Sequence, residues 1–289
     1  EMVKRSVAAI TDIYQNSILK DSSRNSFMIK RMEDLADRTV WAMGEQLKCG
    51  DFVPFVFEHK FNMEVGDGDR KQLMSGTIDR VDICENGTDV YVRIIDYKTG
   101  KKDFNIVKTY YGIDIQLMVY MEAAMKLVAK MRPGKNVIPA GVFYYNISDP
   151  IVSATTESAE EIEDKIKGEL RLKGMVNSDK DIAEKMDNTE GTSLNIPVSR
   201  KADGGFDSRR SKVMNTEQFN ILGRFVDVRA IDTADRIVGG DIRRSPYKDG
   251  QFSSCDRCPY GAVCGFSVDL PGCNYRKLKK FDDEVLWNN

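Results

Sequence analysis

The spacing of apolar residues changes along the chain and separates helical from strand-forming stretches. Over residues 2–49 apolar side chains recur every three to four positions, which predicts amphipathic helices. A polar stretch at Ser22–Ser26 predicts a break between two helices. From Phe55 the pattern changes to one typical of strands. The expected strands cover residues 55–65, 72–84 and 89–98.

Short polar segments between these strands predict hairpins. They are Gly66-Asp67-Gly68-Asp69 and Glu85-Asn86-Gly87-Thr88, and both are rich in residues that suit tight turns. A helix is expected over 109–131, ending before Pro133-Gly134, and it is followed by a strand over 138–147. A strand–helix–strand unit of this kind predicts that the later strand lies parallel to strand 89–98.

The C-terminal half predicts mainly helices and irregular segments. Helices are expected over 157–172, 179–187 and 216–238, the last ending at Gly239-Gly240, with a polar loop over 199–214 between them. The last fifty residues look irregular and hold four of the six cysteines. The predicted organisation is a helical segment over 1–50, a core over 51–150 and a C-terminal extension over 151–289 that packs on the core as one domain.

Composition narrows the class of protein. The chain has 289 residues, 41% of them hydrophobic, and a net charge of −2, so it is not a strongly basic nucleic-acid binder overall. Its apolar runs are too short for a membrane span, and it shows no secretory signal, which predicts a cytoplasmic location. It begins with Glu1 rather than Met, as expected for a piece of a longer protein. It lacks a Gly-Lys-Ser/Thr phosphate loop, so we expect no ATP hydrolysis by this chain alone.

Two strands carry acidic residues in apolar surroundings. Gly76–Asp82 contains Asp79, and Ile94–Gly100 contains Asp96 followed two positions later by Lys98. Side chains two apart in a strand share a face, so Asp96 and Lys98 are expected on one face. Carboxylates suit Mg²⁺ or Mn²⁺, and a lysine can hold negative charge or the attacking water. The alternative is a pair of solvated surface ion pairs, Asp79 with Arg80 and Asp96 with Lys98, which are common and weak.

The helix over 109–131 adds Gln116 and Tyr120. They lie four residues apart and therefore on one helical face. The amide of Gln116 can hydrogen-bond a phosphate, a metal-bound water or Lys98. A surface amide and a core tyrosine would show the same spacing.

Taken together, these three motifs resemble the PD-(D/E)XK nuclease domain of the RecB lineage in order and spacing. The resemblance implies a restriction-endonuclease-like α/β fold with a central mixed sheet flanked by helices. It also implies that Asp79 and Asp96 bind Mg²⁺ and that Lys98 is the catalytic lysine, with Gln116 and Tyr120 as the helix motif of this branch. In that family a further ligand often comes from an N-terminal helix; His59 lies on an expected strand, and we interpret it as structural or surface.

The C-terminal cysteines have the spacing of metal ligands. Cys255, Cys258 and Cys264 follow a Cys-x2-Cys-x5-Cys pattern, which suits zinc or an iron–sulfur cluster in a reducing compartment. Cys273 would complete a local zinc site. Unligated surface thiols are the plain alternative.

This C-terminal pattern resembles the AddB family. The resemblance implies a 4Fe-4S cluster held by Cys255, Cys258 and Cys264 and by a fourth cysteine upstream of the nuclease motifs. Cys49 precedes the strands, but we expect Cys49 and Cys84 to be structural thiols, with the fourth ligand outside this sequence and Cys273 as a possible substitute. DNA and an AddA-like helicase–nuclease subunit are the implied partners.

The sequence therefore predicts a Mg²⁺-dependent deoxyribonuclease of a double-strand-break repair complex, acting as an exonuclease on single strands. The alternatives are a non-catalytic domain that binds DNA ends or acts as a scaffold, and a zinc-bound interaction module. Candidate phosphate contacts are Lys101-Lys102, Arg209-Arg210-x-Lys212 and Arg243-Arg244.

Overall fold

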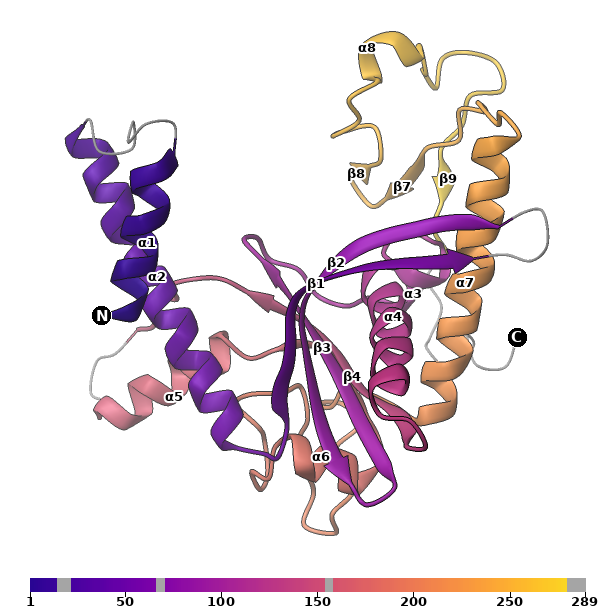
Figure 1. Cartoon of the computed structure of the whole chain (residues 1–289). Helices are drawn as coiled ribbons and strands as arrows, with labels where there is room; N and C mark the ends of the chain where they lie inside the picture. Colours follow the sequence, from indigo (N-terminus) through magenta and orange to yellow (C-terminus); the bar gives the residue numbers. More distant parts are fainter. Residues whose placement is uncertain (15–21, 66–70, 154–157, 280–289) are drawn as a thin grey trace. The chain divides into compact units, whose positions relative to one another are not determined.

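The chain divides into two compact units. The computed structural model describes residues 1–14, 22–65, 71–153 and 158–279 (Figure 1). The first unit comprises residues 1–61, 75–104 and 120–220, and the second comprises residues 62–74, 105–119 and 221–289.

A six-stranded mixed sheet organises the fold, as the predicted fold class requires. Its strands lie in chain order: β1 Val53–Val65, β2 Gln72–Asn86, β3 Asp89–Lys98, β4 Asn136–Asn146, β5 Lys173–Asn177 and β6 Val213–Met214. β2 runs antiparallel to β3, whereas β4 runs parallel to β3. β5 is antiparallel to β4 and parallel to β6. The predicted parallel crossover between β3 and β4 is thus confirmed.

Helices connect and flank the strands. They are α1 Met2–Ile13, α2 Ser23–Lys48, α3 Ile106–Tyr110, α4 Gln116–Met131, α5 Ala159–Glu169, α6 Lys180–Met186, α7 Thr216–Val238 and α8 Gly261–Cys264. Within the first unit, α1 packs along α2 (Figure 1). Serine side chains start two of the helices: Ser22 accepts from the Asn25 amide at the start of α2, and Ser158 forms a capping box with Glu161 at the start of α5. No described helix is long and apolar enough to cross a membrane.

The second unit contains a small three-stranded sheet near the C-terminal end of the described chain. β7 Tyr247–Asp249 lies between β8 Phe252–Ser253 and β9 Arg276–Lys277. The remaining residues between 239 and 279 are mostly turns and irregular segments, as the sequence predicted.

Two element predictions were wrong. The single helix expected over 109–131 is two helices, because Gly112 adopts φ +71° and the chain turns before α4 begins at Gln116. The helix expected over 157–172 is present as α5 but ends three residues earlier, at Glu169, and the sequence did not predict β5, which follows it. Gly174 permits that strand, since a Cβ there would lie 1.9 Å from the Val142 carbonyl oxygen of β4.

Two other predictions concern the turns and breaks between elements. The turn expected at residues 66–69 lies entirely outside the described residues. Of the helix break expected at Ser22–Ser26, only Ser22 is non-helical, because it caps α2 and the next four residues belong to that helix.

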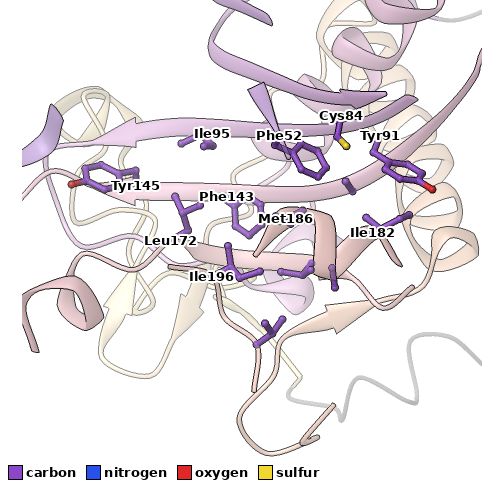
Figure 2. Packing of buried hydrophobic residues seen from close by; sticks show 14 of the residues in the cluster. Phe52, Cys84, Tyr91, Ile95, Phe143, Tyr145, Leu172, Ile182, Met186 and Ile196 are labelled. Atoms are coloured by element: carbon purple, nitrogen blue, oxygen red, sulfur yellow. The ribbon is translucent and has the colours of Figure 1, made fainter. Parts of the chain in front are cut away.

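One face of the sheet packs into a hydrophobic cluster of the first unit (Figure 2). Strand residues Ile95 and Phe143 meet Leu172, Ile182 and Met186 from the segments that cover this face. Phe143 and Ile95 are almost fully buried, so their removal from water contributes strongly to stability, at about 1.5–3 kcal/mol per side chain.

A charged cluster is buried on the same face. The Asp82 carboxylate accepts hydrogen bonds from Arg80 Nε at 2.6 Å and Nη2 at 2.8 Å, and from Arg93 Nε at 2.9 Å. All three side chains are at most 2% exposed. Arg93 also stacks over the Phe52 ring at 4.9 Å from its centroid. One carboxylate thus links two strands through two guanidinium groups, since Asp82 and Arg93 are direct partners in the β2–β3 register.

Burial and charge pairing have opposite effects on the two arginines. Burial lowers the pKa of Arg93, and Asp82 opposes this only in part. Burial acts in the same direction on Arg80, but the Asp82 carboxylate outweighs it and raises the pKa of Arg80. The charge of Asp82 therefore offsets part of the cost of burying both guanidinium groups.

Replacing Asp82 by asparagine should destabilise the first unit strongly. The change keeps the volume and leaves two buried guanidinium groups without a counter-charge, so we expect a loss of about 3–5 kcal/mol in the free energy of unfolding. Urea denaturation measures this. Glu85→Gln on the same strand is the control, because its partner Arg132 and Glu85 itself are partly exposed and the pair contributes about 1 kcal/mol or less. A stability of D82N within about 1 kcal/mol of the unmodified chain would contradict the role assigned to Asp82.

Candidate active site

Asp79 and Asp96 come together on adjacent strands. The register pairs Arg80 with Ile95, so the next positions along β2 and β3 are Asp79 and Asp96. The Tyr97 amide donates to Asp79 Oδ2 at 2.7 Å, which holds the Asp79 carboxylate against the end of β3. Asp79 is half-buried, whereas the Asp96 side chain is only 3% exposed. The sequence-predicted meeting of these carboxylates through a hairpin is therefore present.

Lys98 provides the cation at this site. Its Nζ lies 2.5 Å from Asp96 Oδ2, so both side chains occupy one face of β3 as the alternation predicted. The ammonium also lies 5.6 Å from the centroid of the Tyr144 ring. Asp96 does pair with Lys98, as the surface alternative proposed, but its carboxylate is buried and is not on a solvated face. Arg80 pairs with Asp82, and not with Asp79 as that alternative required.

Tyr97 points to the opposite face. Its ring packs edge-on against Tyr145 with the centroids 5.8 Å apart, and its hydroxyl lies 3.6 Å from Met43 Sδ. Burial raises the pKa of Tyr97 above its ordinary value. Tyr97 therefore anchors the strand through its side chain while its amide orients Asp79.

Gln116 and Tyr120 occupy successive turns of α4. Gln116 is the first residue of the helix, and Tyr120 lies one turn later on the same side. Gln116 belongs to the second compact unit, whereas Tyr120 belongs to the first. Tyr120 packs edge-on against Phe61 of β1 at 5.8 Å between ring centroids.

The donor set of the site fits a hard divalent cation. Asp79 and Asp96 offer carboxylate oxygens from adjacent strands, and the Tyr97 carbonyl is a further oxygen of the same segment. Two carboxylates are what Mg²⁺ usually takes from a protein, because water and substrate phosphate fill its other positions. No third acidic, histidine or cysteine side chain joins them, since the described residues contain no group of three or more that could hold a metal ion.

Other acidic residues and the single histidine have different surroundings. Asp34 pairs with Lys30 on an exposed part of α2, and Glu45 pairs with Lys48 and Lys167. His59 is half-buried on β1, the strand on which the sequence placed it. Its neighbour Glu58 has φ +48°, a left-handed conformation that is uncommon for glutamate and marks a local irregularity of β1.

Backbone hydrogen bonds organise the C-terminal cysteine segment. The Cys258 amide donates to the Cys255 carbonyl at 3.1 Å, and the Cys264 amide donates to the Tyr260 carbonyl at 2.9 Å. Arg244 Nη1 contacts the Cys264 and Gly265 carbonyl oxygens. Cys258 is exposed, Cys255 and Cys264 are half-buried, and Cys273 is buried. Thiolates suit zinc and iron–sulfur clusters. Among the described residues, however, these cysteines do not form a group of three or more side chains that could hold a metal ion, and their assignment as ligands stays a prediction.

The remaining two cysteines lie in the first unit. Cys84 is buried in the hydrophobic cluster, as expected for a structural thiol. Cys49 caps the C-terminal end of α2, is half-buried and donates to the Glu45 carbonyl at 3.3 Å. Burial raises the pKa of both thiols, which disfavours the thiolate form needed for metal binding.

Comparison with protein families agrees with this geometry. A model of the PD-(D/E)XK nuclease superfamily matches residues 2–265, which is most of the chain. The chain belongs to the PD-(D/E)XK nuclease superfamily. The predicted enzyme class, a nuclease and hence a hydrolase, is confirmed by this membership, and the mixed sheet is the fold that the superfamily resemblance implied.

Curated relatives narrow the branch within this superfamily. The chain is 35% identical over 94% of its length to a protein of Thermoanaerobacter sp. (strain X514), and 36% identical over 94% to one of Clostridium botulinum (strain Hall). A protein of Lachnoclostridium phytofermentans is 35% identical over 99% of the chain. Each is named as a subunit of an ATP-dependent helicase/deoxyribonuclease. The chain spans about a quarter of the length of these relatives, 24% to 25%.

The roles of Arg80, Asp82 and Arg93 were not predicted from the sequence. All three were visible there, and Arg80 and Asp82 belong to the Gly76–Asp82 motif itself. Their two-residue spacing along β2 places them on the face opposite Asp79. A charged residue every second position in an apolar strand was the available signal for a buried ion-pair network.

A side chain at Gly76 should destabilise the fold. A Cβ at this position would lie 2.8 Å from Phe61 Cε1 and 3.4 Å from Tyr120 Cε1, so G76A forces the Phe61–Tyr120 pair apart. We expect a loss of about 1–3 kcal/mol in unfolding free energy, measured by urea denaturation. Gly44→Ala on α2 is the control, because a Cβ there meets nothing within 4 Å and alanine favours the helix. Equal stabilities of G76A and G44A would contradict the packing described for Tyr120.

Proposed function

We propose that this chain hydrolyses DNA phosphodiester bonds with Mg²⁺ or Mn²⁺ and acts as an exonuclease on single strands. The observation that carries the proposal is the placement of Asp79, Asp96 and Lys98 at one end of two paired strands in a domain of a nuclease superfamily. The relatives' printed name, which includes deoxyribonuclease, supports DNA as the substrate.

In this proposal each residue has a separate task. Asp79 and Asp96 hold the divalent ion, which when bound polarises the phosphate and promotes ionisation of a water. The Tyr97 amide keeps Asp79 in position. Lys98 neutralises Asp96 in the absence of substrate and is placed to hold negative charge on the phosphate or to orient the attacking water. Gln116 and Tyr120 are proposed to support substrate binding from α4.

The relatives also support a cellular context. Their name describes a subunit of a helicase/deoxyribonuclease. We therefore place the chain in a helicase–nuclease assembly that processes DNA double-strand breaks, with an AddA-like subunit as its partner.

Cleavage of labelled DNA tests the proposed reaction. Purified chain with Mg²⁺ or Mn²⁺ is expected to degrade linear single-stranded DNA and to leave circular single strands intact, since an exonuclease needs an end. D79N and D96N should abolish cleavage, and Lys98→Met should lower the rate about 10²–10⁴-fold. Asp89→Asn is the matched control on β3, because Asp89 contacts the Asn136 side chain at the other end of the strand. Cleavage retained in D96N would contradict the site, and unchanged DNA binding without cleavage would favour a non-catalytic domain that binds DNA ends.

We further propose that Cys255, Cys258 and Cys264 bind a 4Fe-4S cluster together with a fourth cysteine outside this sequence. Support comes from their Cys-x2-Cys-x5-Cys spacing and from the preference of such clusters for thiolate ligands. Iron and zinc analysis of anaerobically purified protein that carries the proposed fourth cysteine, with the visible absorbance spectrum, tests this assignment. Cys258→Ser should remove iron, whereas Cys84→Ser should not. Zinc that depends on Cys273 would identify the local zinc site instead.

A further inference from the structure

The acidic residues of the site belong to a longer row across the sheet. The β3–β4 register pairs Asp96 with Tyr144, and the β4–β5 register pairs Tyr144 with Lys173. Side chains of directly paired residues project to the same face of a sheet. Asp79, Asp96, Tyr144 and Lys173 therefore follow one another over four neighbouring strands, and the row ends in a cation.

A second lysine approaches this row from the loop after β3. Lys102 Nζ lies 5.5 Å from the Tyr144 ring centroid, and Lys98 Nζ lies 5.6 Å from the same centroid. Both ammonium groups are thus gathered around a single aromatic ring next to Asp96. Lys98 belongs to the proposed catalytic group, whereas Lys102 has no role in that reaction.

Asn146 holds the Lys102 loop in place. Its Oδ1 accepts from the Lys102 amide at 3.0 Å, and its Nδ2 donates to the Lys102 carbonyl at 2.9 Å. Asn146 is the partner of Lys98 in the parallel β3–β4 register. The loop that carries Lys102 is therefore tied at two points to the strand beside the site.

A cavity of about 500 Å³ opens between these elements. The loop residues Lys101 and Lys102 line it together with Asn146, Glu169 and Lys173. This volume lies in the range of ligand cavities, roughly 300–1,000 Å³. Asp103 also lines it, but its carboxylate is paired with Lys212 at 2.5 Å. The charged side chains that line it are thus three lysines, Lys101, Lys102 and Lys173, and two carboxylates, Asp103 and Glu169.

Lys173 is half-buried at the end of the row. Burial lowers its pKa, and the nearby Arg171 acts in the same direction. The carboxylates of Asp103 and Glu169 act in the opposite direction on this pKa, and a negatively charged ligand would act in the same direction as they do.

We propose that Lys102 and Lys173 form a subsite for a backbone phosphate of the DNA strand, next to the phosphate that is cleaved. This inference rests on the proposed function for its substrate class. The subsite would hold the strand by its phosphates and not by its bases, because lysine ammonium groups read charge and no base edge is selected. It would place the neighbouring phosphate over Asp79, Asp96 and Lys98.

Binding without cleavage tests the subsite. Fluorescence anisotropy of a fluorescein-labelled single-stranded oligodeoxynucleotide is measured in EDTA over a range of salt concentrations. Lys102→Met and Lys173→Met keep the side-chain length and remove the charge. Each is expected to weaken binding and to lower the slope of log K against log salt by about 0.7, the value for one phosphate contact to a single strand. Lys130→Met on α4 is the control and should keep the slope of the unmodified chain, since Lys130 is exposed and outside the cavity.

The charge-retaining variants Lys102→Arg and Lys173→Arg separate lost contacts from misfolding, because they should restore the slope. Unchanged affinity and slope in both methionine variants would overturn the subsite, as would a lack of DNA binding by the unmodified chain. The outcome is separable from the proposed reaction: a chain that binds with the predicted slopes but does not cleave DNA retains the subsite and refutes the nuclease proposal.

Discussion

The placement of the site depends on one carboxylate shared by two buried guanidinium groups. Asp82 joins Arg80 on its own strand to Arg93 on β3, and the pairing is fully enclosed. A slip of one residue between β2 and β3 would turn these charges to the other face and leave them unpaired, which is energetically prohibitive in a buried sheet. The same register sets Asp79 opposite Asp96. A structural ion-pair network on one face therefore determines the geometry of the acidic site on the other.

One face of the sheet carries the hydrophobic packing, and the other carries the acidic site. Tyr97 illustrates this, because its ring packs on the hydrophobic side while its amide holds the Asp79 carboxylate. Lys98, one residue later, returns to the acidic face and pairs with Asp96. Alternation along a strand thus allows a rigid interior and a charged site to be built from consecutive residues. The row that continues through Tyr144 to Lys173 extends the same principle across the sheet.

Local pattern predicted much of this arrangement. The strand alternation placed Asp96 and Lys98 on one face, and the helix over 216–238 has the expected bounds. Features that depend on contacts between distant segments were not predictable. β5 forms because Gly174 lets it approach β4 closely, and its five residues lie outside every element that the sequence predicted. Lys173 lies in one row with Asp79, Asp96 and Tyr144 only because β5 pairs with β4. Sequence spacing alone could not predict that position. Gly112 indicated a break between α3 and α4. Helical periodicity on both sides of it nevertheless predicted one continuous helix.

The central claim is that Asp79 and Asp96 jointly hold a divalent ion. A crystal of the chain soaked in Mn²⁺ tests it most directly, because the anomalous signal of manganese locates the ion independently of activity. We expect one manganese peak bridging the Asp79 and Asp96 carboxylates, and the loss of that peak in D96N. Manganese bound elsewhere with both carboxylates uncoordinated, or a peak that persists unchanged in D96N, would contradict the claim.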